Sequence, residues 1–207
     1  MNLLRLHQRL ENHTGALIFG ILIVASLGGL VQILPTLFQE SLSTPVAGLS
    51  VYSPLELTGR DIYIREGCST CHSQQIRPLL AEVQRYGPYS RAGEFVYDRP
   101  FLWGSKRTGP DLQRIGGRYT DDWHRAHMTD PRSVVPSSIM PAYPWLAARP
   151  ADDGSIAARL NTLRILGHPY TDEDISGAAD TLNGLTELDA LIAYLQRLGT
   201  SLPEDAE

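Results

Sequence analysis

The sequence predicts a mostly α-helical protein with one N-terminal transmembrane helix and a second part of helices joined by long loops. Two observations predict this fold. Residues 15–34 contain no charged side chain. Later segments repeat apolar residues at helical spacing, and no segment alternates apolar and polar residues convincingly enough to predict a strand. The 207 residues leave room for one ordinary domain besides the anchor.

The anchor is predicted from the length of the uncharged run. At about 1.5 Å per residue, residues 15–34 span about 30 Å as a helix, which matches the hydrocarbon core of a bilayer. A buried core helix seldom runs this long without a polar face. The run also exceeds the ~7–15 apolar residues of a cleaved signal peptide, so we expect it to be retained.

The charges flanking the anchor predict its orientation. Arg5 and Arg9 precede it, and the next Lys or Arg after it is Arg60. The positive-inside rule then places residues 1–14 in the cytoplasm and the chain after residue 38 on the other side. In a bacterium these would be the cytoplasm and the periplasm, separated by the inner membrane.

The rest of the chain is divided by composition and periodicity. Residues 39–54 are rich in Ser, Pro and Gly and are predicted to be a linker. Residues 73–118 contain many Gly, Pro and aromatic residues and are predicted to be mostly loop. Apolar spacing and capping residues predict helices at 55–66, 121–128, 155–166, after Thr171, and at 186–199. The predicted parts are a cytoplasmic N-terminus (1–14), transmembrane anchor (15–38), linker (39–54), periplasmic domain (55–200) and C-terminal tail (201–207).

Composition and charge narrow the class of protein. A hydrophobic content of 43% and a charged content of 20% are those of an ordinary folded protein. The net charge of −5 argues against binding to nucleic acid, which needs a basic surface. The two cysteines lie in one short motif, so they cannot build a disulfide framework.

That motif, CSTCH at residues 68–72, has the CxxCH pattern of covalent haem attachment. Two thiols three positions apart can meet both vinyl groups of one porphyrin. The adjacent histidine can then bind the iron as proximal ligand. Cys68, Cys71 and His72 are therefore the predicted attachment site of one haem c.

Two other chemistries use similar motifs. A thioredoxin-like CxxC needs a surrounding βαβ pattern, which is absent from the sequence. A zinc site needs a second pair of ligands, for which His124 and His127 are candidates. Both alternatives have less support than haem, because the motif follows a predicted helix on the outer side of a membrane anchor.

An electron-carrying haem iron needs a sixth ligand. Met140 is the main candidate, because the surrounding SSIMPAYP loop contains two prolines that can hold a side chain rigidly. A thioether ligand favours ferrous iron relative to a second histidine. A histidine (His124, His127 or His168) or an open site are the alternatives.

Residues 108–112, TGPDL, resemble the TGPxL segment of class I cytochromes c. The resemblance implies that the Pro110 carbonyl accepts a hydrogen bond from Nδ1 of the proximal histidine. Gly59 and Tyr63 precede the CxxCH as a glycine and an aromatic residue do in that class. The implied fold is a class I cytochrome c-like domain with long loop insertions.

The long loop insertions resemble one particular family of membrane-anchored cytochromes. Residues 73–107, with the later segments DDWHRAHMTDPRSVVP and MPAYPWL, look like the mono-haem subunit (subunit II, the O subunit) of cbb(3)-type cytochrome c oxidases. The resemblance covers nearly the whole chain. One position departs from it, because Gln75 stands where a methionine is expected.

The resemblance implies an electron-transfer subunit of a proton-pumping haem-copper oxidase. Such a subunit receives electrons from a di-haem cytochrome c subunit or a soluble cytochrome c and passes them to haem b of the catalytic subunit. The catalytic subunit reduces oxygen, so this chain is expected to have no catalytic residue. The resemblance also allows a structural calcium at the catalytic-subunit interface, although no ligand set stands out.

Three other functions fit a membrane-anchored haem domain. A free-standing cytochrome c could shuttle electrons between complexes, a haem-based sensor would bind CO at a labile sixth site, and a structural subunit would not need its haem. The aromatic residues and arginines of 73–107 favour an oxidase subunit instead. Exposed apolar clusters with arginines often mark interfaces, so we expect this segment to lie against the catalytic subunit.

Overall fold

A computed structural model describes residues 3–201 of the chain. The structure divides into two units, Met1–Thr44 and Pro45–Glu207. Helices are the regular secondary structure of both units, and the described residues contain no strand, only an isolated antiparallel bridge between Pro150 and Thr186. This confirms the predicted fold class.

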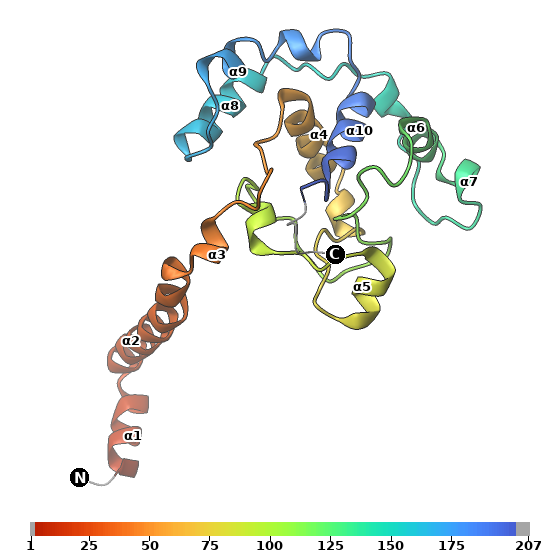
Figure 1. Cartoon of the computed structure of the whole chain (residues 1–207). Helices are drawn as coiled ribbons and strands as arrows, with labels where there is room; N and C mark the ends of the chain where they lie inside the picture. Colours follow the sequence, from red (N-terminus) through yellow and green to blue (C-terminus); the bar gives the residue numbers. More distant parts are fainter. Residues whose placement is uncertain (1–2, 202–207) are drawn as a thin grey trace. The chain divides into compact units, whose positions relative to one another are not determined.

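The N-terminal unit consists of helices alone (Figure 1). Its apolar part, Thr14–Phe38, is 25 residues long, and its length and composition are sufficient to cross a membrane. This part matches the predicted anchor at 15–38. The elements of the unit are α1 (Leu3–Asn12), α2 (Thr14–Ile33), η1 (Leu34–Phe38) and α3 (Glu40–Ser43).

The predicted linker, residues 39–54, contains the short helix α3. Glu40 begins this helix and places a negative charge at its positive N-terminal end. The remainder of the segment contains Gly48 at a positive φ of 77° and has no helix until residue 54. The assignment of this segment as a linker stays a prediction.

The C-terminal unit begins with α4 (Pro54–Arg65), close to the predicted 55–66. Ser53 caps it, because its hydroxyl accepts from the Glu56 N–H at 3.3 Å while the Glu56 carboxylate accepts from the Ser53 N–H at 2.7 Å. The last helix, α10 (Glu187–Arg197), has the same kind of capping box at Thr186.

Helices α4 and α10 cross at close range (Figure 1). A Cβ atom on Gly59 would lie 1.9 Å from the Ala190 carbonyl oxygen, so only glycine permits this approach. Next to the crossing, the rings of Tyr63 and Tyr194 meet edge to face with centroids 5.5 Å apart. The predicted terminal helices therefore form the centre of the domain.

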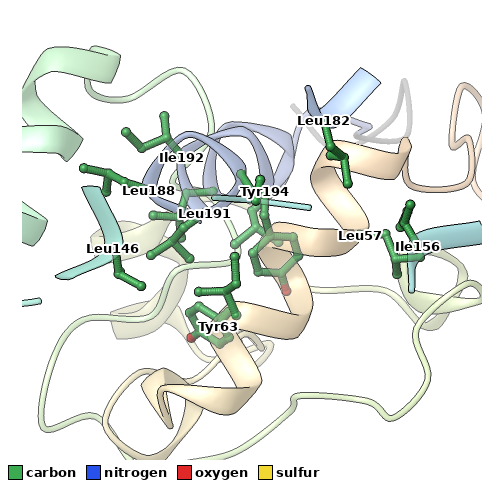
Figure 2. Packing of buried hydrophobic residues seen from close by; sticks show 14 of the residues in the cluster. Leu57, Tyr63, Leu146, Ile156, Leu182, Leu188, Leu191, Ile192 and Tyr194 are labelled. Atoms are coloured by element: carbon green, nitrogen blue, oxygen red, sulfur yellow. The ribbon is translucent and has the colours of Figure 1, made fainter. Parts of the chain in front are cut away.

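Apolar side chains from other parts of the domain, including η4 (Pro144–Ala147), α8 (Ile156–Ile165) and η5 (Asp180–Leu182), belong to the same core cluster as this crossing (Figure 2). Their burial removes apolar surface from water and supplies the main favourable free energy of folding. The buried residues labelled in Figure 2 are Leu57, Tyr63, Leu146, Ile156, Leu182, Leu188, Leu191, Ile192 and Tyr194.

The remaining helices are short and are separated by loops. The predicted helices at 121–128 and 155–166 correspond to α6 and α8, and Thr171 caps α9 as predicted. The bounds are η2 (Cys68–Thr70), α5 (Leu80–Tyr86), η3 (Ala92–Phe95), α6 (Asp121–Thr129), α7 (Pro131–Val134), η4 (Pro144–Ala147), α8 (Ile156–Ile165), α9 (Asp172–Ser176) and η5 (Asp180–Leu182).

The insertion at 73–107 agrees with one prediction and differs from another. Its two short helices, α5 and η3, leave most of 73–118 as loop, as expected. Tyr86 and Phe95, which were expected to be exposed, are buried in the domain. Phe101 and Trp103 are exposed, at 47% and 41%, so only part of the predicted aromatic surface reaches solvent.

Candidate functional site

The CSTCH motif lies on a tight turn directly after α4. Gly67 has a left-handed conformation, with φ of 74°, and redirects the chain into η2. The Cys71 N–H and the His72 N–H both donate to the Cys68 carbonyl, at 3.1 and 2.9 Å. Both cysteines are free thiols, and burial, with the nearby Glu66 charge, raises the pKa of the Cys68 thiol to about 12.

The His72 ring is held from the opposite segment of the chain. Its Nδ1 lies 2.8 Å from the Pro110 carbonyl oxygen. Because the carbonyl can only accept, Nδ1 carries the hydrogen and Nε2 keeps its lone pair. Burial lowers the pKa of His72, which favours the neutral ring that binds iron.

Gly109 makes this approach sterically feasible. A Cβ atom at this position would lie 2.2 Å from Cε1 of His72 and 2.7 Å from both ring nitrogens. The Gly109 N–H also donates to the Cys71 carbonyl at 3.0 Å. The TGPDL segment therefore holds the turn that carries His72 in three ways. Gly109 lies close to the His72 ring, the Pro110 carbonyl accepts from His72 Nδ1, and the Gly109 N–H donates to the Cys71 carbonyl.

A cavity of about 740 Å³ lies beside this segment, within the range of about 300–1,000 Å³ found for small-molecule and cofactor sites. All five predicted site residues line it: Cys68, Cys71, His72, Pro110 and Met140. The rest of its wall is largely apolar, as a porphyrin requires, with Tyr63, Leu112, Ile115, Met128, Leu191 and Leu195. The donor set and the cavity therefore fit one haem.

The loop around Met140 supplies part of this wall. The Met140 N–H donates to the Ser138 hydroxyl at 3.2 Å, and Pro141 fixes the backbone that follows. Met140 is partly buried and packs against the main core. Its thioether is the methionine sulfur that the sequence predicts as a ligand.

Two histidines of α6 line the same cavity, whereas His168 lies elsewhere and packs against Tyr97 and Tyr170. Burial lowers the pKa of His124 and of His127. The sequence analysis considered these two only as alternative metal ligands. Their spacing of three on one helix was the signal that they share a face.

Aromatic stacking positions this pair. The Trp123 ring stacks on Tyr119 with centroids 4.0 Å apart and on His127 with centroids 4.7 Å apart. It meets His124 edge to face at 5.4 Å. Helix α6 thus presents an ordered aromatic wall to the cavity, which the sequence analysis did not anticipate.

Asp111 connects the two segments that carry His72 and Pro110, a role that the sequence analysis missed. Its carboxylate accepts from the Ser73 hydroxyl at 2.6 Å and from the Gln75 N–H at 2.9 Å. It also accepts from the Gln113 N–H at 2.9 Å. Since residue 75 bonds through its backbone, this contact does not depend on whether Gln or Met is present there.

Two arginines of the insertion form ion pairs inside the chain. Arg77 and Arg107 both pair with Glu82, the latter at 2.8 Å. These contacts lower the pKa of Glu82 to about 2, the hydrogen bond from Arg77 contributing most. The expected contact of the arginines of 73–107 with another subunit stays a prediction, and Arg77 and Arg107 already have a partner in Glu82 within the chain.

No group of three or more His, Cys, Asp or Glu side chains lies together as a metal-binding cluster between residues 3 and 201. The structural calcium allowed by the resemblance stays a prediction without a ligand set in this part of the chain. A haem site does not form such a cluster, because the protein would supply only two ligands to the iron, His72 and Met140, and the porphyrin supplies the others.

A family model described as cytochrome c oxidase, mono-haem subunit/FixO, matches residues 7–185. The chain belongs to this family. It is therefore a mono-haem electron-transfer subunit of a cbb(3)-type cytochrome c oxidase, an oxidoreductase complex in which it partners the catalytic subunit. A search of curated proteins gives no significant match.

Proposed function

We propose that this subunit passes single electrons through one covalent haem c to haem b of the catalytic subunit. The observation that carries the proposal is that one cavity gathers both thiols of the CSTCH motif, His72 and Met140. These residues come from segments far apart in the sequence. Their convergence on one cavity is what a covalently attached, six-coordinate haem requires.

The residues have distinct roles in this proposal. Cys68 and Cys71 hold the haem by thioether bonds, and His72 and Met140 are the axial ligands of its iron. The Pro110 carbonyl fixes the His72 ring and makes it a better donor to the metal. When bound, the haem supplies the one-electron exchange between ferrous and ferric iron.

The chain acts as a relay in a proton-pumping oxidase. A di-haem cytochrome c subunit or a soluble cytochrome c supplies the electrons, and the catalytic subunit reduces oxygen. The apolar helix at Thr14–Phe38 anchors the subunit in the bacterial inner membrane. Arg5 and Arg9 favour a cytoplasmic N-terminus and a periplasmic haem domain.

The test is haem staining of the full-length chain. Denaturing electrophoresis with peroxidase staining should show haem on the wild-type chain matured in a host able to attach it. Replacing Cys68 and Cys71 with Ala should abolish the stain, whereas Ser69→Ala with Thr70→Ala should keep it. An unstained wild-type chain would refute covalent attachment.

The proposed contact with the catalytic subunit uses the exposed part of 73–107. The rings of Phe101 and Trp103 stack with centroids 4.4 Å apart at the domain surface. Hydrogen exchange at the exposed part of 73–107, around Phe101 and Trp103, should be slower in the assembled oxidase than in the isolated chain. Equal exchange in the isolated chain, with assembly surviving Phe101→Ala and Trp103→Ala, would place the interface elsewhere.

The nearest alternative is a free-standing anchored cytochrome c that shuttles electrons between complexes. Family membership favours the oxidase subunit. Affinity purification of the tagged chain distinguishes the two functions. The oxidase subunit should bring the catalytic subunit with it, whereas a shuttle would purify alone.

A further inference from the structure

His124 is a buried side chain without a hydrogen-bond partner in the cavity wall. The residue is only 2% exposed. Neither of its ring nitrogens, Nδ1 or Nε2, reaches a donor or acceptor among residues 3–201. Native proteins seldom leave buried polar atoms unpaired, because such atoms lose their hydrogen bonds to water without replacement. His124 therefore calls for a partner from outside the chain.

Helix α6 holds this ring against the cavity. The Thr120 hydroxyl caps the helix by accepting from the Trp123 N–H at 3.2 Å. The rings of Trp123 and Tyr119 both meet His124 nearly at right angles, at 84–85°. These contacts hold the ring in the wall of the cavity that His72 and Met140 also line, and Tyr119 and Trp123 belong to the same wall.

The chemistry of His124 matches one group of a haem. Burial lowers the pKa of His124, so at neutral pH its ring is neutral and carries one N–H donor. In the proposed site, the vinyl groups of the haem form thioether bonds with the two cysteines, and His72 and Met140 are the axial ligands of the iron. The propionate carboxylates remain as hydrogen-bond acceptors.

The charges in the cavity wall also suit propionates. Arg85 and Arg118 line the cavity and contribute positive charge. The carboxylate of Glu66, also in the wall, pairs with Arg65 at 2.8 Å, and that of Asp111 is occupied by three hydrogen bonds within the domain. The anionic groups of the wall are therefore already paired.

We infer that a ring N–H of His124 donates a hydrogen bond to a propionate of haem c and so helps to position the haem. The inference rests on the proposed function, because it requires haem in this cavity. A donor at a propionate offsets part of its negative charge and favours ferrous iron. Loss of the donor should therefore lower the reduction potential of haem c.

The test compares two matched substitutions in the assembled oxidase. His124→Phe removes the ring nitrogens and keeps an aromatic ring. His168→Phe is the control, because His168 is also buried, at 4% exposure, and its Nε2 is also unpartnered, yet it lies outside the cavity wall. His124→Phe should lower the haem c potential and shift the propionate bending band in resonance Raman spectra. His168→Phe should leave both unchanged.

Two further measurements separate hydrogen bonding from packing. His124→Gln restores an N–H donor and should return the potential toward the wild-type value. The reduced wild-type chain, labelled with ¹⁵N-histidine in detergent, should show a slowly exchanging His124 ring proton close to the propionate methylenes. This measurement holds even if His124→Phe prevents assembly, and absence of that proton contact would overturn the inference.

These experiments distinguish failure of this inference from failure of the proposed function. A wild-type chain without haem stain overturns the proposed function and this inference together. A stained wild type with an unchanged potential and propionate band in His124→Phe overturns the inference alone. Wild-type ferric protein that lacks the far-red sulfur-to-iron band and has His124 as its sixth ligand would also overturn the inference, because the ring would then bind iron and not a propionate.

Discussion

Replacing Gly109 with Ala is the most direct test of how the chain holds its proximal histidine. The new Cβ would lie 2.2 Å from Cε1 of His72, whereas ordinary van der Waals contact begins at 3.4 Å. The His72 ring therefore has to move by about 1 Å to relieve the overlap. Gly109 does not have a positive φ, so alanine adds no backbone strain of its own.

This displacement breaks the hydrogen bond between His72 Nδ1 and the Pro110 carbonyl, which is 2.8 Å long. Such a bond contributes about 1 kcal/mol to stability. Loss of the group that orients a metal ligand typically lowers metal affinity by about 10–100-fold. We expect a corresponding weakening of the iron–histidine bond, and a higher reduction potential because the ring becomes a poorer donor.

The assay is a spectroscopic comparison with Gly104→Ala. Gly104 lies in the same insertion, also lacks a positive φ, and has open space around the position of a Cβ. Gly109→Ala should raise the potential and give ferric protein with a high-spin fraction, while Gly104→Ala should match the wild type. Wild-type spectra and potential in Gly109→Ala would refute the steric reasoning.

Three further substitutions test other parts of the domain. Met140→Ala should abolish the far-red sulfur-to-iron band of the ferric protein, and an unchanged spectrum would mean that another residue is the ligand. Gly59→Ala should destabilise the domain by about 3 kcal/mol, seen as a lower Tm, because its Cβ overlaps the Ala190 carbonyl; an unchanged Tm would contradict this packing. Glu82 has a pKa lowered from 4.5 to about 2, so its charge stabilises the fold above about pH 4.5 and the effect is lost as the pH falls through 2. Glu82→Gln should therefore be less stable than the wild type at pH 7, with the difference closing in acid; a constant difference would contradict the ion pairs with Arg77.

Local patterns in the sequence were sufficient to predict most helices and the residues of the candidate site. Apolar spacing and capping residues are properties of one segment, so helices α4 and α10 were predicted to within about two residues. The positions of Cys68, Cys71 and His72 followed from one motif. The residue opposite His72, Pro110, followed only from a resemblance, because the two lie 38 residues apart.

The missed features depend on contacts between distant segments. Helix α5 is short, and the side chain that ties it down, Glu82, pairs with Arg107, which lies 25 residues further along the chain. Tyr86 is buried by tertiary contacts that no periodicity within 73–107 reveals. Asp111 accepts hydrogen bonds from Ser73 and Gln75, at the start of the insertion, and from Gln113, beyond its end. Single-segment patterns carry no information about such pairings.

The crossing of α4 and α10 also fixes the order in which the domain can be completed. Arg65 and Glu187, which pair at 2.7 Å beside the crossing, are 122 residues apart. A chain emerging from its N-terminus exposes the CSTCH turn long before residue 187 exists. Contacts this distant also form slowly, because a long loop must close first. The CSTCH turn is therefore accessible in an open chain before α10 packs against α4, and the proposed haem attachment would fall in this interval.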